Sequence, residues 1–107
     1  MAPDRIEAYL EQHLALWRTR GRDRLHGGFH ERLDAKGTPL AVGYKRLLVQ
    51  CRQIFAHSLA AGIGFRESAD AAHQGFLFLR RHYRDERRGG WFFSVTPDGK
   101  PRDRRKD

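Results

Sequence analysis

The feature that most constrains this chain is an internal repeat with an offset of 62 residues. Four glycine and proline positions recur at this offset: Gly27, Gly28, Gly37 and Pro39 match Gly89, Gly90, Gly99 and Pro101. Repeats of this length are typical of stacked or ring-closed helical pairs. The 107 residues hold about 1.7 such units, so we interpret residues 1–107 as one partial domain with no separate second domain.

Three segments have helical periodicity, at residues 3–20, 44–61 and 67–83. The second segment is apolar nearly all round, which predicts an inner helix buried on several sides. Its main apolar stripe comprises Leu48, Cys51, Phe55 and Leu59, and we expect Cys51 to be a small buried residue. A stripe on the first segment comprises Ile6, Leu10, Leu14 and Trp17. In the third segment Gly75 weakens the helix, which predicts a close packing partner at that position.

Two glycine-rich segments follow the first and third helices. Residues 27–37 and 89–99 each begin with Gly-Gly, continue with an aromatic residue and end in a glycine turn. This pattern predicts a short strand entering a hairpin turn in both repeats. The repeating unit is therefore a helical pair followed by a short Gly-Gly β-hairpin.

The composition excludes several classes of protein. The formal charge is +8, which suggests nucleic-acid binding, but the basic residues are scattered and 17 of the 21 are Arg. The single Cys51 excludes an intramolecular disulfide and a cysteine-cluster zinc site. No apolar run approaches the roughly 18–20 residues that span a bilayer, and the N-terminus lacks a secretory signal. We therefore expect a cytoplasmic protein without membrane partners.

The motifs resemble those of a known family. The stretch 27–30, the turn 34–37 and the segment 45–55 resemble the N-terminal part of the N-acylglucosamine 2-epimerase family, and residues 75–79, 89–91 and 98–101 resemble its next repeat. The resemblance implies the all-α fold of helical-hairpin repeats in an (α/α)6 barrel. Six units need about 370 residues, so we expect an incomplete, truncated N-terminal portion.

The resemblance also implies a chemistry. Family members are sugar 2-epimerases and aldose–ketose isomerases, which transfer the proton at C2 of an open-chain sugar through an enediolate. The family's acid and base are two histidines of later repeats, so none of the six histidines here is assigned a catalytic role. We expect no cofactor, and no turnover by this chain alone.

Arg52 is the strongest candidate for binding the sugar. It matches the arginine of the family's Gln-Ala-Arg motif, with Cys51 in place of alanine. The resemblance implies that Arg52 points into the barrel and binds sugar oxygens. The alternative is a buried arginine that bridges repeats, because an unpaired charge on an apolar helix is costly.

The remaining candidates are weaker. Phe29 and Trp91 follow the Gly-Gly pairs and have faces that could stack on a sugar, but hairpin packing is the preferred interpretation. His26 and His30 flank Gly27-Gly28, and we expect no metal there because such a pair binds metal chiefly on a helix. His57 is interpreted as a packing or capping residue.

Two other functions remain open. The chain could be a non-enzymatic helical interaction module that associates with itself or a partner through exposed apolar helix faces. Alternatively, its basic tail could bind nucleic acid in a salt-dependent way. We favour this function less than the other two.

Overall fold

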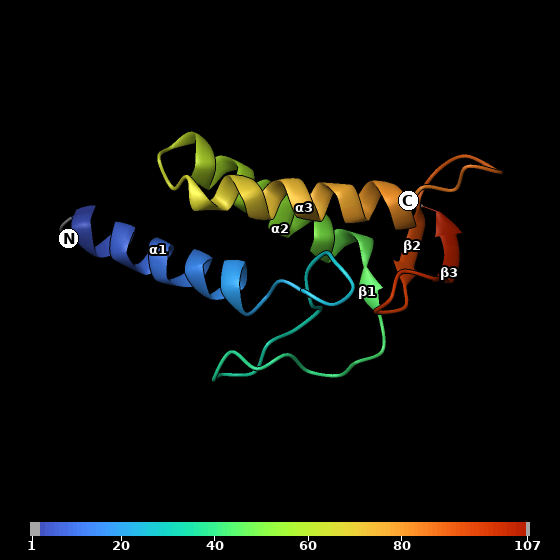
Figure 1. The fold of residues 1–107 in the computed structure, drawn as a ribbon, viewed down its shortest axis with the longest axis horizontal. Coiled ribbons are helices and arrows are strands. Elements are labelled where there is room, and N and C mark those ends of the chain that lie inside the picture. Colours follow the sequence, from blue (N-terminus) through green and yellow to red (C-terminus); the bar gives the residue numbers. More distant parts are fainter. Residues whose placement is uncertain (1–2, 107) are drawn as a thin grey trace.

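Two helices and a small sheet form the centre of the structure, and a third helix lies to one side (Figure 1). The computed structural model describes the backbone of residues 3–106 and the side chains of residues 5–102. Its elements, in chain order, are α1 (Pro3–Thr19), β1 (Lys45–Arg46), α2 (Leu47–Gly62), α3 (Glu67–His82), β2 (Phe92–Val95) and β3 (Pro101–Lys106). The helices α2 and α3 run antiparallel in contact along their length, and the sheet lies beyond the end of α3.

The three predicted helices are confirmed, with one correction at the start of α2. Lys45 and Arg46 form the strand β1 in place of the first helical turn. They pair antiparallel with Val95 and Ser94 of β2, which in turn pairs with β3. This pairing joins residues separated by about fifty positions in the chain, so local periodicity could not reveal it.

The predicted hairpin of the second repeat is confirmed by β2 and β3, but the strand predicted after Gly27-Gly28 is wrong. That segment forms only isolated bridges, Arg22 with Phe29 and Leu33 with Pro39. In the second repeat β1 borders β2 and extends the ladder, whereas within the described residues no strand borders the segment 29–33. A strand without a neighbour has no ladder in which to satisfy its backbone groups.

The repeat recurs in the hydrogen bonds of the two Gly-Gly turns. The Asp23 N–H donates to the Gly28 carbonyl at 2.9 Å, and the Asp85 N–H donates to the Gly90 carbonyl at the same distance. Each aspartate also accepts two backbone N–H groups of its own turn through Oδ1. Both glycines of each pair have positive φ, a conformation that favours glycine. The Gly-Gly pairs therefore serve the same turn in both repeats.

The core lies between α2, α3 and the sheet. Its buried cluster comprises Leu47, Phe78, Leu79, Tyr83 and Val95. The packing partner predicted for Gly75 is present: a Cβ there would lie 2.7 Å from Cε2 of Phe29 and 2.9 Å from Cγ1 of Ile54. The missing side chain at Gly75 thus lets α3 approach both α2 and the first Gly-Gly turn.

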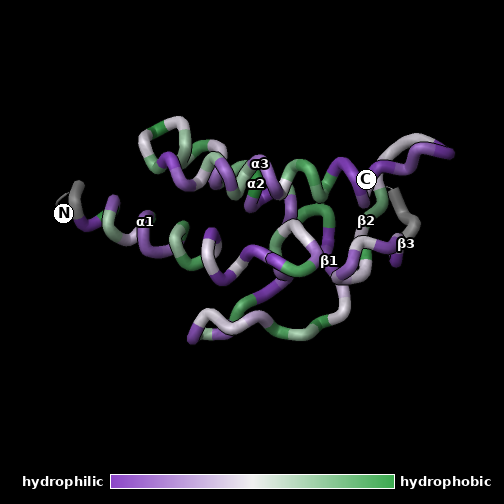
Figure 2. The backbone as a smooth tube through the Cα atoms, in the orientation of Figure 1, coloured by the Kyte–Doolittle hydropathy of each residue, from purple (hydrophilic) through white to green (hydrophobic). Residues whose placement is uncertain are grey.

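The prediction that α2 is buried on several sides is wrong for this chain. Leu48, Phe55 and Leu59 are 47%, 64% and 55% exposed, although α2 carries much of the apolar sequence (Figure 2). The buried residues of α2 are Leu47, Gln50, His57 and Ala60, which face α3 and the first turn. Packing on one flank therefore leaves the predicted apolar stripe uncovered. On α1, Ile6 and Leu10 are likewise exposed.

We expect Gly75→Ala to destabilise the fold by about 1–3 kcal/mol, because its methyl group would overlap Phe29 and Ile54. Gly62→Ala is the matched control, since Gly62 also lies in a helix but has nothing within 4 Å of an added Cβ. Urea unfolding followed by circular dichroism measures both free energies. Equal stabilities for the two variants would contradict the close packing at Gly75.

Candidate functional site

Arg52 lies in the middle of an uncovered face of α2. This open face consists of Leu48, Arg52, Phe55 and Leu59, spaced four, three and four residues apart on one side of the helix. Within the part of the chain that the structure describes, no group forms a hydrogen bond or ion pair with the exposed Arg52 side chain. The bridging role considered for a buried arginine is therefore not what this structure presents.

The open face combines one fixed positive charge with apolar neighbours. A guanidinium has five N–H donors in a planar fork and stays protonated at any physiological pH. Bordered by the exposed apolar side chains of Leu48 and Phe55, it offers hydrogen bonds to oxygen atoms beside apolar surface. This arrangement suits a ligand with several oxygens and a carbon skeleton.

The opposite face of α2 is anchored through Gln50 and His57. Gln50 is fully buried, and its side-chain amide accepts the Phe29 N–H at 2.9 Å and donates to the Phe29 carbonyl at 2.7 Å. The His57 ring stacks on the Phe29 ring with centroids 5.2 Å apart, and its Nδ1 lies 2.8 Å from the Gln53 carbonyl. His57 thus has the packing role predicted for it, and these contacts set the rotation of α2 that leaves Arg52 exposed.

The two aromatic candidates have different environments. Phe29 has no exposed surface, because Gly75, His57 and the turn enclose it. Its burial favours the packing role over stacking on a sugar. Trp91 is half-buried and lies against the core cluster at the end of an apolar groove between α2 and α3.

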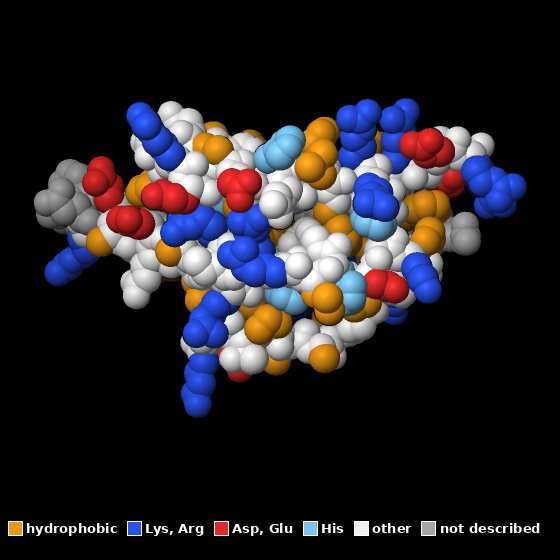
Figure 3. Space-filling view, viewed as in Figure 1, with side chains coloured by type: hydrophobic (Ala, Val, Ile, Leu, Met, Phe, Trp, Pro, Cys, Tyr) orange, Lys and Arg blue, Asp and Glu red, His pale blue; other side chains and the backbone are white. Residues whose placement is uncertain are grey.

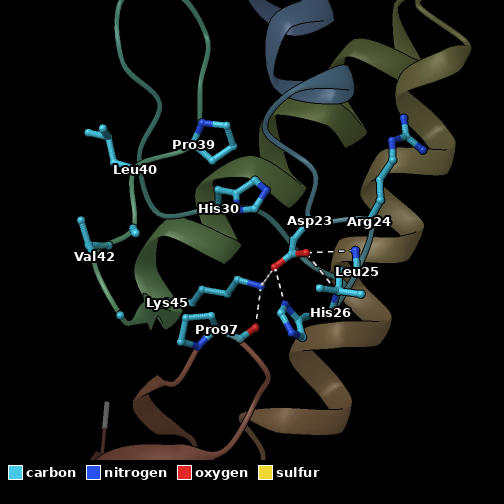
Figure 4. A pocket seen from close by; sticks show the side chains of 12 residues that line it. Asp23, Arg24, Leu25, His26, His30, Pro39, Leu40, Val42, Lys45 and Pro97 are labelled. Atoms are coloured by element: carbon cyan, nitrogen blue, oxygen red, sulfur yellow. Dashed lines mark hydrogen bonds and ion pairs between the residues drawn. The ribbon is translucent and has the colours of Figure 1, made fainter.

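A second charged cluster forms around Lys45, whose side chain is almost completely buried (Figure 4). Its Nζ donates to Oδ2 of Asp23 at 2.7 Å, to the Gly27 carbonyl at 2.9 Å and to the Pro97 carbonyl at 2.8 Å. Because an ammonium has three donors, all of its hydrogen bonds are made within the protein. Nζ also lies 4.7 Å from the centroid of the Phe78 ring.

Asp23 is the counter-charge of Lys45. Burial alone would raise the pKa of Asp23, but hydrogen bonds from Lys45 and the His26 backbone, with the charge of Lys45, lower it to about 2. The pair borders a cavity of about 630 Å³ whose other walls include His26, His30 and the loop of residues 39–43. Since the charges are already paired, this cavity presents no unsatisfied charged group from Asp23 or Lys45.

The two histidines next to Gly27-Gly28 have different surroundings. His26 Nδ1 lies 3.2 Å from Oδ2 of Asp23, and burial lowers the pKa of His30. Among the described residues, no group of three or more His, Cys, Asp and Glu side chains is arranged to hold a metal ion. No helix in the described range is long and apolar enough to cross a membrane.

The prediction for Cys51 is wrong, because its residue is exposed. The stripe that contains Cys51 lies outside the buried side of α2, which comprises Leu47, Gln50, His57 and Ala60. Cys51 lies on the border between the open face of α2 and the apolar groove that ends at Trp91.

The family resemblance of the Gly-Gly motifs is confirmed by a family model. The family model of N-acylglucosamine 2-epimerase matches residues 27–107, which is most of the chain. The chain belongs to this family.

Relatives of the epimerase-family chain include a mannose-6-phosphate isomerase from Rhizobium meliloti (strain 1021), 36% identical over 89 residues, with 81% of this chain and 22% of that protein covered. A solved cellobiose 2-epimerase from Spirochaeta thermophila DSM 6192 is 26% identical with a TM-score of 0.71, covering 94% of this chain and 28% of that one. A solved D-mannose isomerase is 23% identical with a TM-score of 0.84. This match covers 96% of this chain and 26% of the isomerase.

These likenesses establish the fold class predicted above. The structure consists of helical-hairpin repeats of the (α/α)6-barrel type, with a small sheet at the Gly-Gly hairpin. The chain spans about a quarter of the length of the relatives that it matches.

Sequence reasoning missed the structural roles of Lys45 and Gln50. Both lie within the stretch that resembles the family, but neither residue type by itself indicates a buried clamp. The match between Asp23 and Asp85 at the repeat offset was the available signal, since an aspartate before a Gly-Gly turn caps that turn. The partner of Asp23 is Lys45, which lies in β1. Only the tertiary structure shows that these two side chains meet.

We expect Lys45→Met to lower the free energy of unfolding by about 3–5 kcal/mol, because it leaves the carboxylate of Asp23 buried without a counter-charge. The double variant Lys45→Met/Asp23→Asn should recover part of that loss. Lys36→Met, at an exposed position, is the control. Chemical denaturation measures all three, and a Lys45→Met variant as stable as the control would refute the role of the pair.

The stability should also depend on buried neutral histidines. Burial lowers the pKa of His57 below 6.5, and contacts with the Gln53 and Leu14 carbonyls offset this only in part. The unfolded chain therefore binds a proton near pH 6.5 that the folded chain does not, so stability is complete above this pH and falls as the pH is lowered. Burial likewise lowers the pKa values of His30 and His82.

We expect His57→Gln to reduce the slope of unfolding free energy against pH between about pH 7 and pH 5, by at most about 1.4 kcal/mol per pH unit. Urea titrations across this range measure the slope. His73→Gln is the matched control, because the His73 side chain is exposed. An unchanged slope in His57→Gln would show that its protonation is not linked to folding.

Proposed function

We propose that this chain is the Arg52-bearing part of a sugar 2-epimerase or aldose–ketose isomerase. The observation that carries the proposal is the exposed guanidinium of Arg52 at the centre of the open face of α2, in a chain of the N-acylglucosamine 2-epimerase family. Relatives are named for sugar substrates: mannose 6-phosphate, cellobiose and mannose. The substrate class is accordingly an aldose in its open-chain form.

The reaction requires loss of the proton on C2, next to the C1 carbonyl. An enediolate forms, and its oxygen gains negative charge as the C–H bond breaks. Reprotonation of C2 from the other face gives the epimer, and reprotonation of C1 gives the ketose. The Arg52 guanidinium would hydrogen-bond the C1 or C2 oxygen and stabilise the developing charge.

The acid and the base must come from elsewhere in a complete barrel. His57 is enclosed behind Phe29, and the ring of His26 is bonded to Asp23, so neither is placed beside Arg52 to move a proton at C2. We therefore propose that the 107-residue chain binds and orients the sugar but does not turn it over alone. Assays of the purified chain with mannose, cellobiose and N-acetylmannosamine should give no product.

The binding role of Arg52 is tested best in a chimera. The segment of the Rhizobium meliloti mannose-6-phosphate isomerase that matches this chain is replaced by the chain, and conversion of mannose 6-phosphate is measured. Arg52→Gln should lower kcat/KM by about 100-fold or more, because it removes the charge aimed at the oxyanion. Arg52→Lys should keep the charge but lose the planar fork, and should give an intermediate value.

Arg80→Gln, also an exposed arginine on a helix, is the matched control and should leave kcat/KM unchanged. Circular dichroism of each variant separates a folding defect from a loss of chemistry. Full activity of the folded Arg52→Gln chimera would refute the assignment. Turnover by the isolated chain would overturn the proposal that it supplies only part of the site.

The nucleic-acid alternative rests on the basic tail, and the side chains of residues 103–107 at its end lie outside the described range. On the face shown in Figure 3, Lys and Arg side chains are spread over α1, the loops and α3, with Asp and Glu side chains between them. A phosphate backbone is bound best by a continuous basic stripe.

A further inference from the structure

The loop of residues 39–43 borders the cavity beside Lys45, which we call the loop cavity (Figure 4). Both ends of this loop are fixed to the rest of the chain. At one end the Leu40 N–H donates to the Arg32 carbonyl at 3.0 Å, and at the other end Lys45 pairs with Val95 in the sheet. The loop cavity is therefore a preformed space, and its volume of about 630 Å³ falls within the range of small-molecule sites.

The walls of the loop cavity are mainly apolar. They include Leu25, Pro39, Leu40, Ala41, Val42 and Pro97. The charged groups of Asp23 and Lys45 neutralise each other, since Oδ2 and Nζ are 2.7 Å apart. Arg24 is exposed and points away from this pair (Figure 4). These walls favour a neutral and mainly apolar occupant, because a charge without a partner would be costly there.

Two imidazole rings give the loop cavity its free polar atoms. Nδ1 of His26 lies 3.2 Å from Oδ2 of Asp23. Because a carboxylate only accepts, this nitrogen donates, and Nε2 of the neutral His26 ring is left as an acceptor. The His30 ring lies between the loop and Asp23 (Figure 4), and burial lowers its pKa, so it is neutral at physiological pH. Within the described residues, no group bonds to Nε2 of His26 or to the ring of His30.

We propose that the loop cavity binds a neutral, mainly apolar molecule that carries a hydroxyl group. The hydroxyl donates to Nε2 of His26, and the apolar body lies against the loop. A neutral His30 ring has one donor and one acceptor nitrogen, so it offers the same hydroxyl a second partner. The loop cavity shares no lining residue with the open face of α2, and the proposal is therefore independent of the proposed sugar chemistry.

The first test compares two probes of nearly the same shape, 2-naphthol and 2-methoxynaphthalene, at about pH 8, where imidazole is neutral. Both have the same apolar rings, but only 2-naphthol has a hydroxyl that donates. In nuclear magnetic resonance titrations, 2-naphthol should shift the amide signals of residues 26–30 and 39–43 until the site is saturated. We expect 2-methoxynaphthalene to bind about tenfold or more weakly, because it would cover Nε2 of His26 without supplying a donor.

These titrations use the unaltered chain, so their outcome does not depend on the folding of a variant. Equal affinities for the two probes would refute the hydrogen bond to His26. The absence of a saturable shift at the loop cavity would refute the site itself. Shifts confined to the apolar groove between α2 and α3 would also overturn the proposal, because they would show binding to apolar surface alone.

The second test replaces the acceptor. His26→Phe keeps an aromatic ring but removes Nε2, so the affinity for 2-naphthol should fall to that for 2-methoxynaphthalene. His73→Phe is the matched control, since His73 is exposed and does not line the loop cavity; it should leave both affinities unchanged. Circular dichroism checks that each variant is folded. A folded His26→Phe variant that still prefers 2-naphthol would refute the role of His26.

Discussion

The ammonium of Lys45 is the interaction on which the arrangement of the two repeats depends. Its three hydrogen bonds reach Asp23 and Gly27 in the first Gly-Gly turn and Pro97 in the hairpin of the second repeat. Because a buried charge is tolerated only with its donors satisfied, these three segments must meet at one point. Lys45 also belongs to β1, so the same residue sets the sheet register and the start of α2.

A chain of contacts leads from this point to the candidate site. The turn that Lys45 holds presents the Phe29 peptide, Gln50 binds that peptide, and the position of Gln50 fixes the rotation of α2. Arg52 follows two residues later on the opposite side of the helix and is therefore exposed. The site residue makes none of the contacts that place it, which leaves its guanidinium available to a ligand.

The two uncovered surfaces of the chain differ in chemistry. The open face of α2 carries a charge amid apolar residues, as expected of a surface that meets a polar ligand. The groove between α2 and α3 that Trp91 borders is almost wholly apolar. Phe55 borders both surfaces, so the apolar groove adjoins the surface around Arg52.

Much of the fold followed from the sequence alone. Apolar spacing located all three helices, and glycine positions that require positive φ revealed the repeat and its turns, because both signals depend on neighbours within a few residues. The family's motif singled out Arg52. Only the tertiary structure decided that Lys45–Arg46 is a strand, that Phe29 is enclosed and that the stripe with Cys51 faces outward. Those outcomes depend on which distant segments pack together, and periodicity along one helix does not say which of its faces a neighbour will cover.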